Sequence, residues 1–337
     1  MRLRTMAAVF LCTAIGQIAD AQEVSESPTQ LPPLLQVPDC TPIPNRNSQR
    51  SKRGVPDYDR SLIYLPETLP ADDDPEGECA ADRYWIAPAI YYGWTAPSTS
   101  FRLPNSFVND GLAPPARIGY GLTAGGWFSD ERKNALELGG LYLSQGVART
   151  GPIAFVGPNG MTTANSEFRE QYLTATAMLR RRLFRDEQFE FDLLLGYVYA
   201  RVGEVATVAV DPNLATVGRA RTNFHGRSLG FAGQYRYEEW TLNVSGTAAL
   251  GFSFGHWNAN GQNFDKRRFA VLPAVTMRLD RSICENGRAF VGYDFQYLSR
   301  AARAADNLPV FNGPMAVQPR QGEFWFQALN AGVEVRF

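Results

Sequence analysis

Few side chains in this chain of 337 residues could carry catalysis, since it holds only two histidines. A lipase-type site needs serine, histidine and asparagine together, and a protease-type site needs histidine beside carboxylates. His225 has Ser228 three positions away, but in a strand that spacing puts the two on opposite faces. His256 is expected at the mouth of a loop beside Trp257. Because the partners are missing, we expect both histidines to be interfacial or loop residues and the protein not to be an enzyme.

Metal, cofactor and nucleic-acid sites are not indicated either. Cys40, Cys79 and Cys284 have no metal-ligand spacing. Cys40 could pair with Cys79, but the sequence leaves the connectivity open. No glycine-rich phosphate loop occurs, and a net charge of -1 gives no reason to expect nucleic-acid binding. We therefore predict no metal and no cofactor.

The first 21 residues are typical of a secretory signal peptide. Two arginines precede an apolar stretch at Met6–Ile15, and small residues Ala19 and Ala21 flank the expected cleavage site. Residues 22–81 are rich in Pro, Ser, Asp and Glu, a composition that cannot bury enough apolar surface to fold. We expect a disordered periplasmic extension there and an ordered domain over residues 82–337.

Apolar and polar residues alternate in ten segments of that domain, as they do in strands with one apolar face. Glycine, with 30 residues, and 41 aromatic residues fit a membrane barrel with aromatic interfacial girdles. The segments are Arg83–Trp94, Arg117–Phe128, Asn134–Ser144, Phe168–Leu183, Phe189–Val202, Ser228–Tyr237, Trp240–Leu250, Phe269–Leu279, Arg288–Leu298 and Phe324–Phe337.

The connections between these segments alternate in length. Long ones are expected at Thr95–Ala116, Gln145–Ser166, Gly203–His225, Gly255–Lys266 and Arg300–Gln321, and short turns lie between them. An up-and-down transmembrane β-barrel has this pattern, with short turns in the periplasm and long loops outside. We predict an all-β antiparallel barrel of about ten strands. Residues 204–217 form a further hairpin, expected as an extracellular extension; if it crossed the membrane, the count would be twelve.

The last segment of the sequence is apolar at every second position and ends on Phe337. We expect this strand to close the barrel against the first strand near Tyr84, with Phe337 in the aromatic girdle. Its outward residues also match the type of C-terminal signal that the barrel-assembly machinery reads. The expected signal comprises Leu329, Val333, Val335 and Phe337.

The charged residues between the apolar ones are the candidates for a lumen lining. Both signs occur, which fits a polar pore that selects small solutes or a lumen filled by ion pairs. A ten-stranded barrel is close to the size at which side chains fill the interior. We therefore favour a narrow or plugged lumen. The predicted lining residues are Arg117, Glu137, Arg169, Glu190, Asp192, Arg236, Arg288, Asp294, Glu334 and Arg336.

Several motifs together resemble one family. They occur at residues 83–86, 125–130, 136–142, 269–275, 291–298 and 324–332, for example Gly125-Gly126-Trp127-Phe128 and Val291-Gly292-Tyr293-Asp294. In this order and spacing they resemble the beta-barrel porin-7 family of planctomycete-type bacteria. The resemblance covers residues 83–337, implies an outer-membrane barrel and supplies no catalytic residues.

We therefore expect a bacterial outer-membrane barrel with a structural or surface-interaction role. The alternative is a narrow porin for small solutes, and a remote alternative is an outer-membrane hydrolase. The expected partners are outer-membrane lipids, the barrel-assembly machinery during insertion, and an unidentified partner of the extracellular loops.

Overall fold

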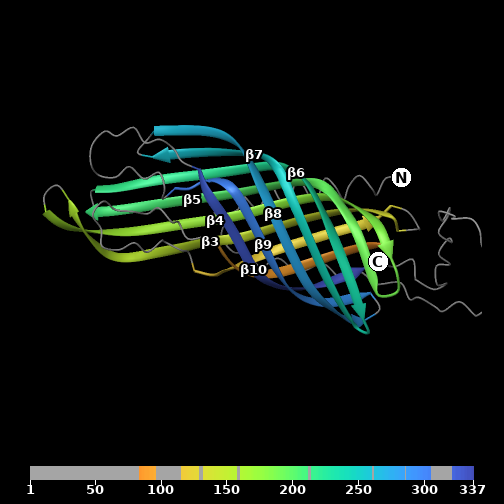
Figure 1. Cartoon of the computed structure of the whole chain (residues 1–337). Helices are drawn as coiled ribbons and strands as arrows, with labels where there is room; N and C mark the ends of the chain where they lie inside the picture. The colour runs from red at the N-terminus through yellow and green to blue at the C-terminus, as the bar shows by residue number, and fades with distance from the viewer. Residues whose placement is uncertain are drawn as a thin grey trace, which may run out of the picture. The chain divides into compact units, whose positions relative to one another are not determined.

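The computed structural model describes residues 83–95, 115–128, 132–157, 160–211, 214–259, 262–284, 286–304 and 321–337 (Figure 1). The predicted signal peptide with Ala19 and Ala21, the 22–81 extension, Cys40 and Cys79 lie outside these residues. Within the described ranges, no helix has the length and apolar character that crossing a bilayer requires.

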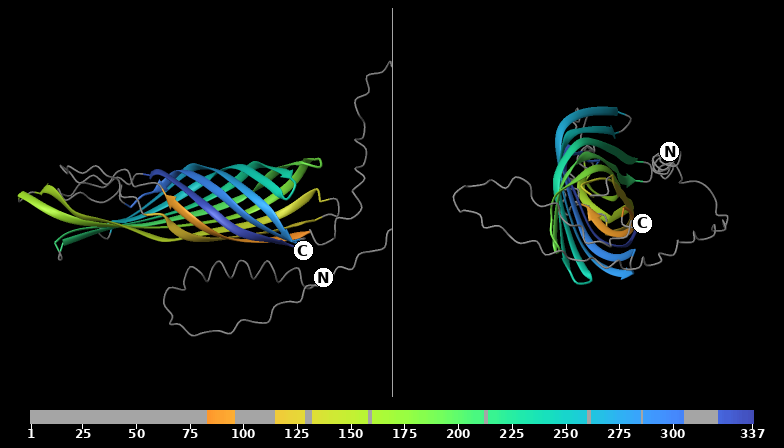
Figure 2. Two further views of the ribbon diagram at one scale, coloured as in Figure 1. Left: turned by 90° about the horizontal axis from the view of Figure 1, so that it is seen from below. Right: turned by 90° about the vertical axis from the view of Figure 1, so that its right-hand side faces the viewer.

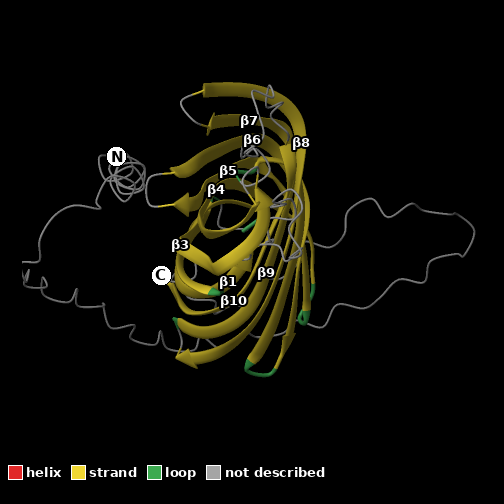
Figure 3. Cartoon of the chain, turned by 90° about the vertical axis from the view of Figure 1, so that its left-hand side faces the viewer, coloured by secondary structure: helices red, strands yellow, loops and turns green. Residues whose placement is uncertain are grey.

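Ten antiparallel strands form a closed barrel in which each strand pairs with its neighbours in the chain, and β1 pairs with β10 (Figure 3). This confirms the predicted fold class and ten strands, and the count of twelve is wrong. The strands are β1 (Tyr84–Thr95), β2 (Arg117–Trp127), β3 (Asn134–Gly157), β4 (Gly160–Arg185), β5 (Phe189–Asp211), β6 (Leu214–Tyr237), β7 (Trp240–Ala259), β8 (Gln262–Cys284), β9 (Gly287–Ala302) and β10 (Gln321–Arg336).

Phe337 closes the seam between the first and last strands, as predicted. The backbone N–H of Tyr84 donates to the Phe337 carbonyl at 2.8 Å, and the N–H of Phe337 donates to the Tyr84 carbonyl at 2.9 Å. The two rings stack with centroids 6.1 Å apart. A closed sheet leaves no row of unpaired backbone groups, which is what crossing hydrocarbon demands.

The two ends of the barrel differ. The turn end carries Phe337 and the short turns after β4, β6 and β8, whereas β3–β8 run on past the barrel in long hairpins at the other end, the hairpin end (Figure 2). The loops predicted at Gln145–Ser166, Gly203–His225 and Gly255–Lys266 are therefore wrong in large part. These residues continue the strands, because their alternation extends almost to the tips. The 204–217 hairpin extends β5 and β6, as predicted.

The outer face of the barrel carries a broad apolar belt. Ile90 is 59% exposed, Tyr120 60% and Leu250 54%, although all three lie within central parts of their strands. A surface this apolar is the kind that a bilayer covers. Exposed aromatic residues ring the belt at the turn end: Tyr84, Phe128, Phe184, Phe189, Tyr235, Tyr237, Trp240 and Phe337.

Strand β4 faces the opposite way from the prediction. Tyr172, Thr174 and Met178 are buried, and the outward positions are held by residues such as Leu179. Both faces of this strand mix apolar with polar residues, so alternation could not identify the lipid face. The predicted lumen residue Arg169 is consequently on the outer face, and its assignment to the lumen is wrong.

Candidate functional site

The turn-end half of the lumen contains a polar cavity of about 290 Å³. Residues from all ten strands line it, because every second residue of a barrel strand points inward. Seven arginines and five carboxylates face this space. The predicted lumen residues among them are Glu137, Glu190, Asp192, Arg236, Asp294, Glu334 and Arg336.

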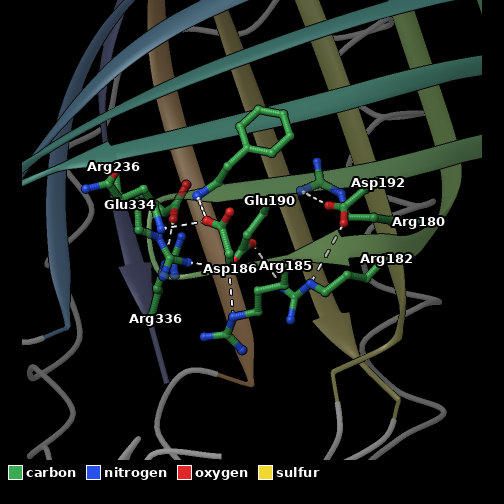
Figure 4. Close-up of polar contacts among 11 residues, drawn as sticks. Arg180, Arg182, Arg185, Asp186, Glu190, Asp192, Arg236, Glu334 and Arg336 are labelled. Atoms are coloured by element: carbon green, nitrogen blue, oxygen red, sulfur yellow. Dashed lines mark hydrogen bonds and ion pairs between the residues drawn. The ribbon is translucent and has the colours of Figure 1, made fainter. Parts of the chain in front are cut away.

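Glu190 is the centre of one ion-pair network in this cavity (Figure 4). Its carboxylate accepts from Arg236 at 2.6 Å and lies 3.1 Å from Arg182 and 3.2 Å from Arg185. The neighbouring Asp192 lies 3.5 Å from Arg180. Since both carboxylates are nearly inaccessible to solvent, these contacts offset the cost of their desolvation.

A second network crosses from β8 to β10. The Arg278 guanidinium pairs with Asp280 at 2.6 Å and with Glu334, whose carboxylate also accepts from Arg336 Nε at 2.8 Å. Arg278 in addition lies 4.4 Å from the centroid of the Phe290 ring. The lumen charges of opposite sign are thus paired within a strand, between adjacent strands or across one intervening strand, rather than arranged as separate rings of one sign.

On the hairpin-end side of the cavity, an apolar layer lies inside the barrel. The ring of Tyr172 on β4 lies 5.1 Å from that of Phe324 and 5.2 Å from that of Phe326, both on β10. Three strands separate β4 from β10 in the barrel order, so these contacts cross the interior. The Tyr172 hydroxyl donates to Gln296 Oε1 at 2.6 Å.

The same layer receives buried side chains from β3 to β10. All have little or no access to solvent, and together they pack as one cluster. Side chains packed in this way leave little room for water among them. Besides the three aromatic residues above, its larger members are Leu141, Leu143, Met178, Val198, Val202, Phe224, Leu272 and Leu298.

A third layer, at the hairpin end, is ionic. Arg117 Nη2 donates to Glu170 Oε1 at 2.7 Å, with 6% and 0% of the two side chains exposed. Arg303, just after β9, lies 2.5 Å from Glu204 and 3.7 Å from Glu170. The backbone N–H of Ala304 donates to Glu204 at 2.8 Å, which holds this segment inside the barrel.

The remaining predicted residues lie elsewhere. Arg117 is inside the barrel, in the ionic layer. Arg288 is in register with Glu334 near the turn end and does not line the cavity. Arg169 pairs with Glu167 on the outer face. The predicted outward residues of the last strand, Leu329, Val333, Val335 and Phe337, are 44–57% exposed.

Both histidines also point outward. His225 Nδ1 lies 2.5 Å from the Tyr197 hydroxyl, and its ring contacts Tyr199. His256 Nδ1 lies 2.6 Å from Asp265 on the adjacent strand, with both side chains at least half exposed. His256 is in strand β7 and not at the mouth of a loop. Among the described residues, no three His, Cys, Asp or Glu side chains gather as metal ligands, and Cys284 is free and exposed.

The predicted lumen lining named only charged residues and left out the aromatic residues that pack inside the barrel. Phe324 and Phe326 lie an odd number of positions from the outward Phe337, so counting back along β10 places them inside. Tyr172 offered no such signal, because both faces of β4 mix apolar with polar residues.

Comparisons with known proteins concern the fold. No family model and no curated protein matches the chain. The outer membrane protease OmpT of Escherichia coli superposes with a TM-score of 0.54 at 10% identity, covering 77% of this chain and 98% of that one. The translocator domain of the autotransporter NalP from Neisseria meningitidis gives 0.39 at 12% identity, covering 78% and 90%. The chain has an outer-membrane β-barrel fold. At 10% identity the likeness to OmpT concerns the fold alone.

Proposed function

We propose that this protein is an outer-membrane barrel with a closed lumen and a structural or surface-interaction role. The contact of Tyr172 with Phe324 and Phe326 carries the proposal, because it joins opposite walls of the barrel in a buried apolar layer. The ionic layer of Arg117, Glu170, Arg303 and Glu204 closes the same passage a second time.

The proposed location is a bacterial outer membrane, with the turn end in the periplasm and the hairpin end outside. Short turns on the periplasmic side are the rule in such barrels. The apolar belt and the resemblance to the beta-barrel porin-7 family support this placement. Outer-membrane lipids and the barrel-assembly machinery are the proposed partners, with Leu329–Phe337 as the assembly signal. The proposal includes no catalytic activity.

A narrow porin is the second candidate, favoured by the cavity of about 290 Å³. Its arginines and carboxylates could hold a small charged solute. For such a solute to pass, the aromatic layer and the Arg303–Ala304 segment would both have to move. We rank this function second because two separate layers obstruct it.

Permeability of proteoliposomes tests the proposal. Full-length protein is inserted into vesicles, insertion is checked by heat-modifiable migration on a detergent gel, and swelling is followed in small sugars and amino acids. The closed barrel gives the swelling rate of protein-free vesicles. Swelling that rises with the amount of inserted protein would establish the porin instead.

A further inference from the structure

A hollow on the outer face of the hairpin extensions lies directly beyond the apolar belt. On β5 the outward residues are apolar or aromatic from Phe189 to Tyr199, and the next outward residue is Arg201. On β6 the outward run from Tyr237 to Leu229 gives way to Arg227 and further arginines. This is the level at which lipid headgroups meet a barrel wall.

The hollow has a volume of about 550 Å³. Gly203 lies in its floor, in register with Gln171 on one side and Arg221 on the other. A methyl group added at Gly203 would meet no atom within 4 Å, so the space above this glycine is open. Four arginines from three strands surround it: Arg169, Arg201, Arg219 and Arg221.

Three of these arginines lack a carboxylate partner within the part of the chain that the structure describes: Arg201, Arg219 and Arg221. Burial lowers the pKa of the Arg201 guanidinium, and the nearby positive charge of Arg221 lowers it further. Like charges held this close favour an added anion.

The acidic groups around the hollow are already engaged. Asp265 pairs with His256, and Glu167, just outside the lining, pairs with Arg169 and Arg149. Glu170 and Glu204 also border the hollow, but their carboxylates point to the other face of the sheet and bind Arg117 and Arg303 there. The hollow therefore presents a net positive surface to the outside.

We propose that this hollow binds the phosphate groups of a phosphorylated, acylated glycolipid of the outer leaflet. Guanidinium groups match phosphate oxygens in charge and in bidentate geometry. The acyl chains of the same lipid would lie along the apolar belt, on the turn-end side of the hollow, against outward residues such as Leu195 and Leu229. The continuity of the basic hollow with the apolar belt is why a lipid fits better than a free anion.

The test uses full-length protein in detergent micelles, titrated with diphosphorylated lipid A and followed by native mass spectrometry. A triple variant replaces Arg201, Arg219 and Arg221 by Gln. Arg281→Gln is the matched control, because Arg281 is an exposed arginine at the turn end. Heat-modifiable migration verifies that each variant folds, and the single variant Arg219→Gln, at an exposed position, serves if the triple variant does not.

We expect the triple variant, or removal of the lipid phosphates, to weaken binding by at least about tenfold, with Arg281→Gln unchanged. Glu167→Gln, which releases Arg169, should tighten it by up to about fivefold. Equal binding by wild type and triple variant would overturn the proposal. So would full displacement of the lipid by millimolar inorganic phosphate, which would indicate a site for free anions. The inference rests on the proposed outer-membrane location, whereas the closed lumen is tested independently by vesicle swelling.

Discussion

Replacing Tyr172 by Ala tests whether the centre of the barrel is packed. The side chain is 2% exposed and contacts two aromatic rings at 5.1 and 5.2 Å, so truncation leaves a cavity that the rigid barrel wall cannot collapse to fill. Buried aromatic residues truncated to Ala cost about 3–5 kcal/mol of unfolding free energy. Tyr172→Phe keeps the ring and removes only the hydrogen bond to Gln296, which costs about 1 kcal/mol.

The assay is reversible urea unfolding in lipid vesicles, followed by tryptophan fluorescence. Tyr92→Ala is the control, since Tyr92 is an aromatic residue of the outer belt and 55% exposed. A loss below about 1 kcal/mol for Tyr172→Ala would refute the reasoning, because a ring standing in a water-filled lumen would lose little on truncation.

Three further outcomes follow from the ion pairs and the seam. Glu170→Gln should destabilise the barrel by about 3–5 kcal/mol in the same unfolding assay, because it leaves the buried Arg117 unpaired. Arg169→Gln should change stability by less than about 1 kcal/mol, since its ion pair is exposed; a large loss would place this residue inside. Phe337→Ala removes the stacking on Tyr84 and should lower the fraction of heat-modifiable protein in outer-membrane fractions, and an unchanged fraction would contradict its role in closing the barrel.

Alternation was sufficient to predict the barrel. Strands such as β2 and β6 carry large apolar residues on one face and glycine, glutamine or arginine on the other, so the lipid face is unambiguous. The alternating lengths of the connections indicated an up-and-down order of strands, and Phe337 was correctly placed beside Tyr84. Strand length was underestimated, because an extended hairpin outside the membrane follows the same two-residue period as one inside it.

The interior was harder to predict, because its packing depends on residues far apart in the chain. Glu190 and Asp192 were assigned to the lumen from their strand alone. Nothing in the local sequence indicates that Tyr172 contacts Phe326 across the barrel. Nor does it indicate that Arg303, the residue after β9, pairs with Glu204 on β5. These contacts form only when the barrel closes. The sequence favoured a narrow or plugged lumen, but it did not indicate an apolar layer between the polar cavity and the ionic layer.

Single-channel recording in planar bilayers tests the closed lumen most directly. Purified full-length protein is added at moderate salt, and insertion is verified in matched vesicles by heat-modifiable migration. The proposed closed lumen predicts a flat current trace at every voltage that the bilayer tolerates, with the aromatic and ionic layers as the two barriers. Discrete conductance steps that scale with the amount of inserted protein would contradict a closed barrel.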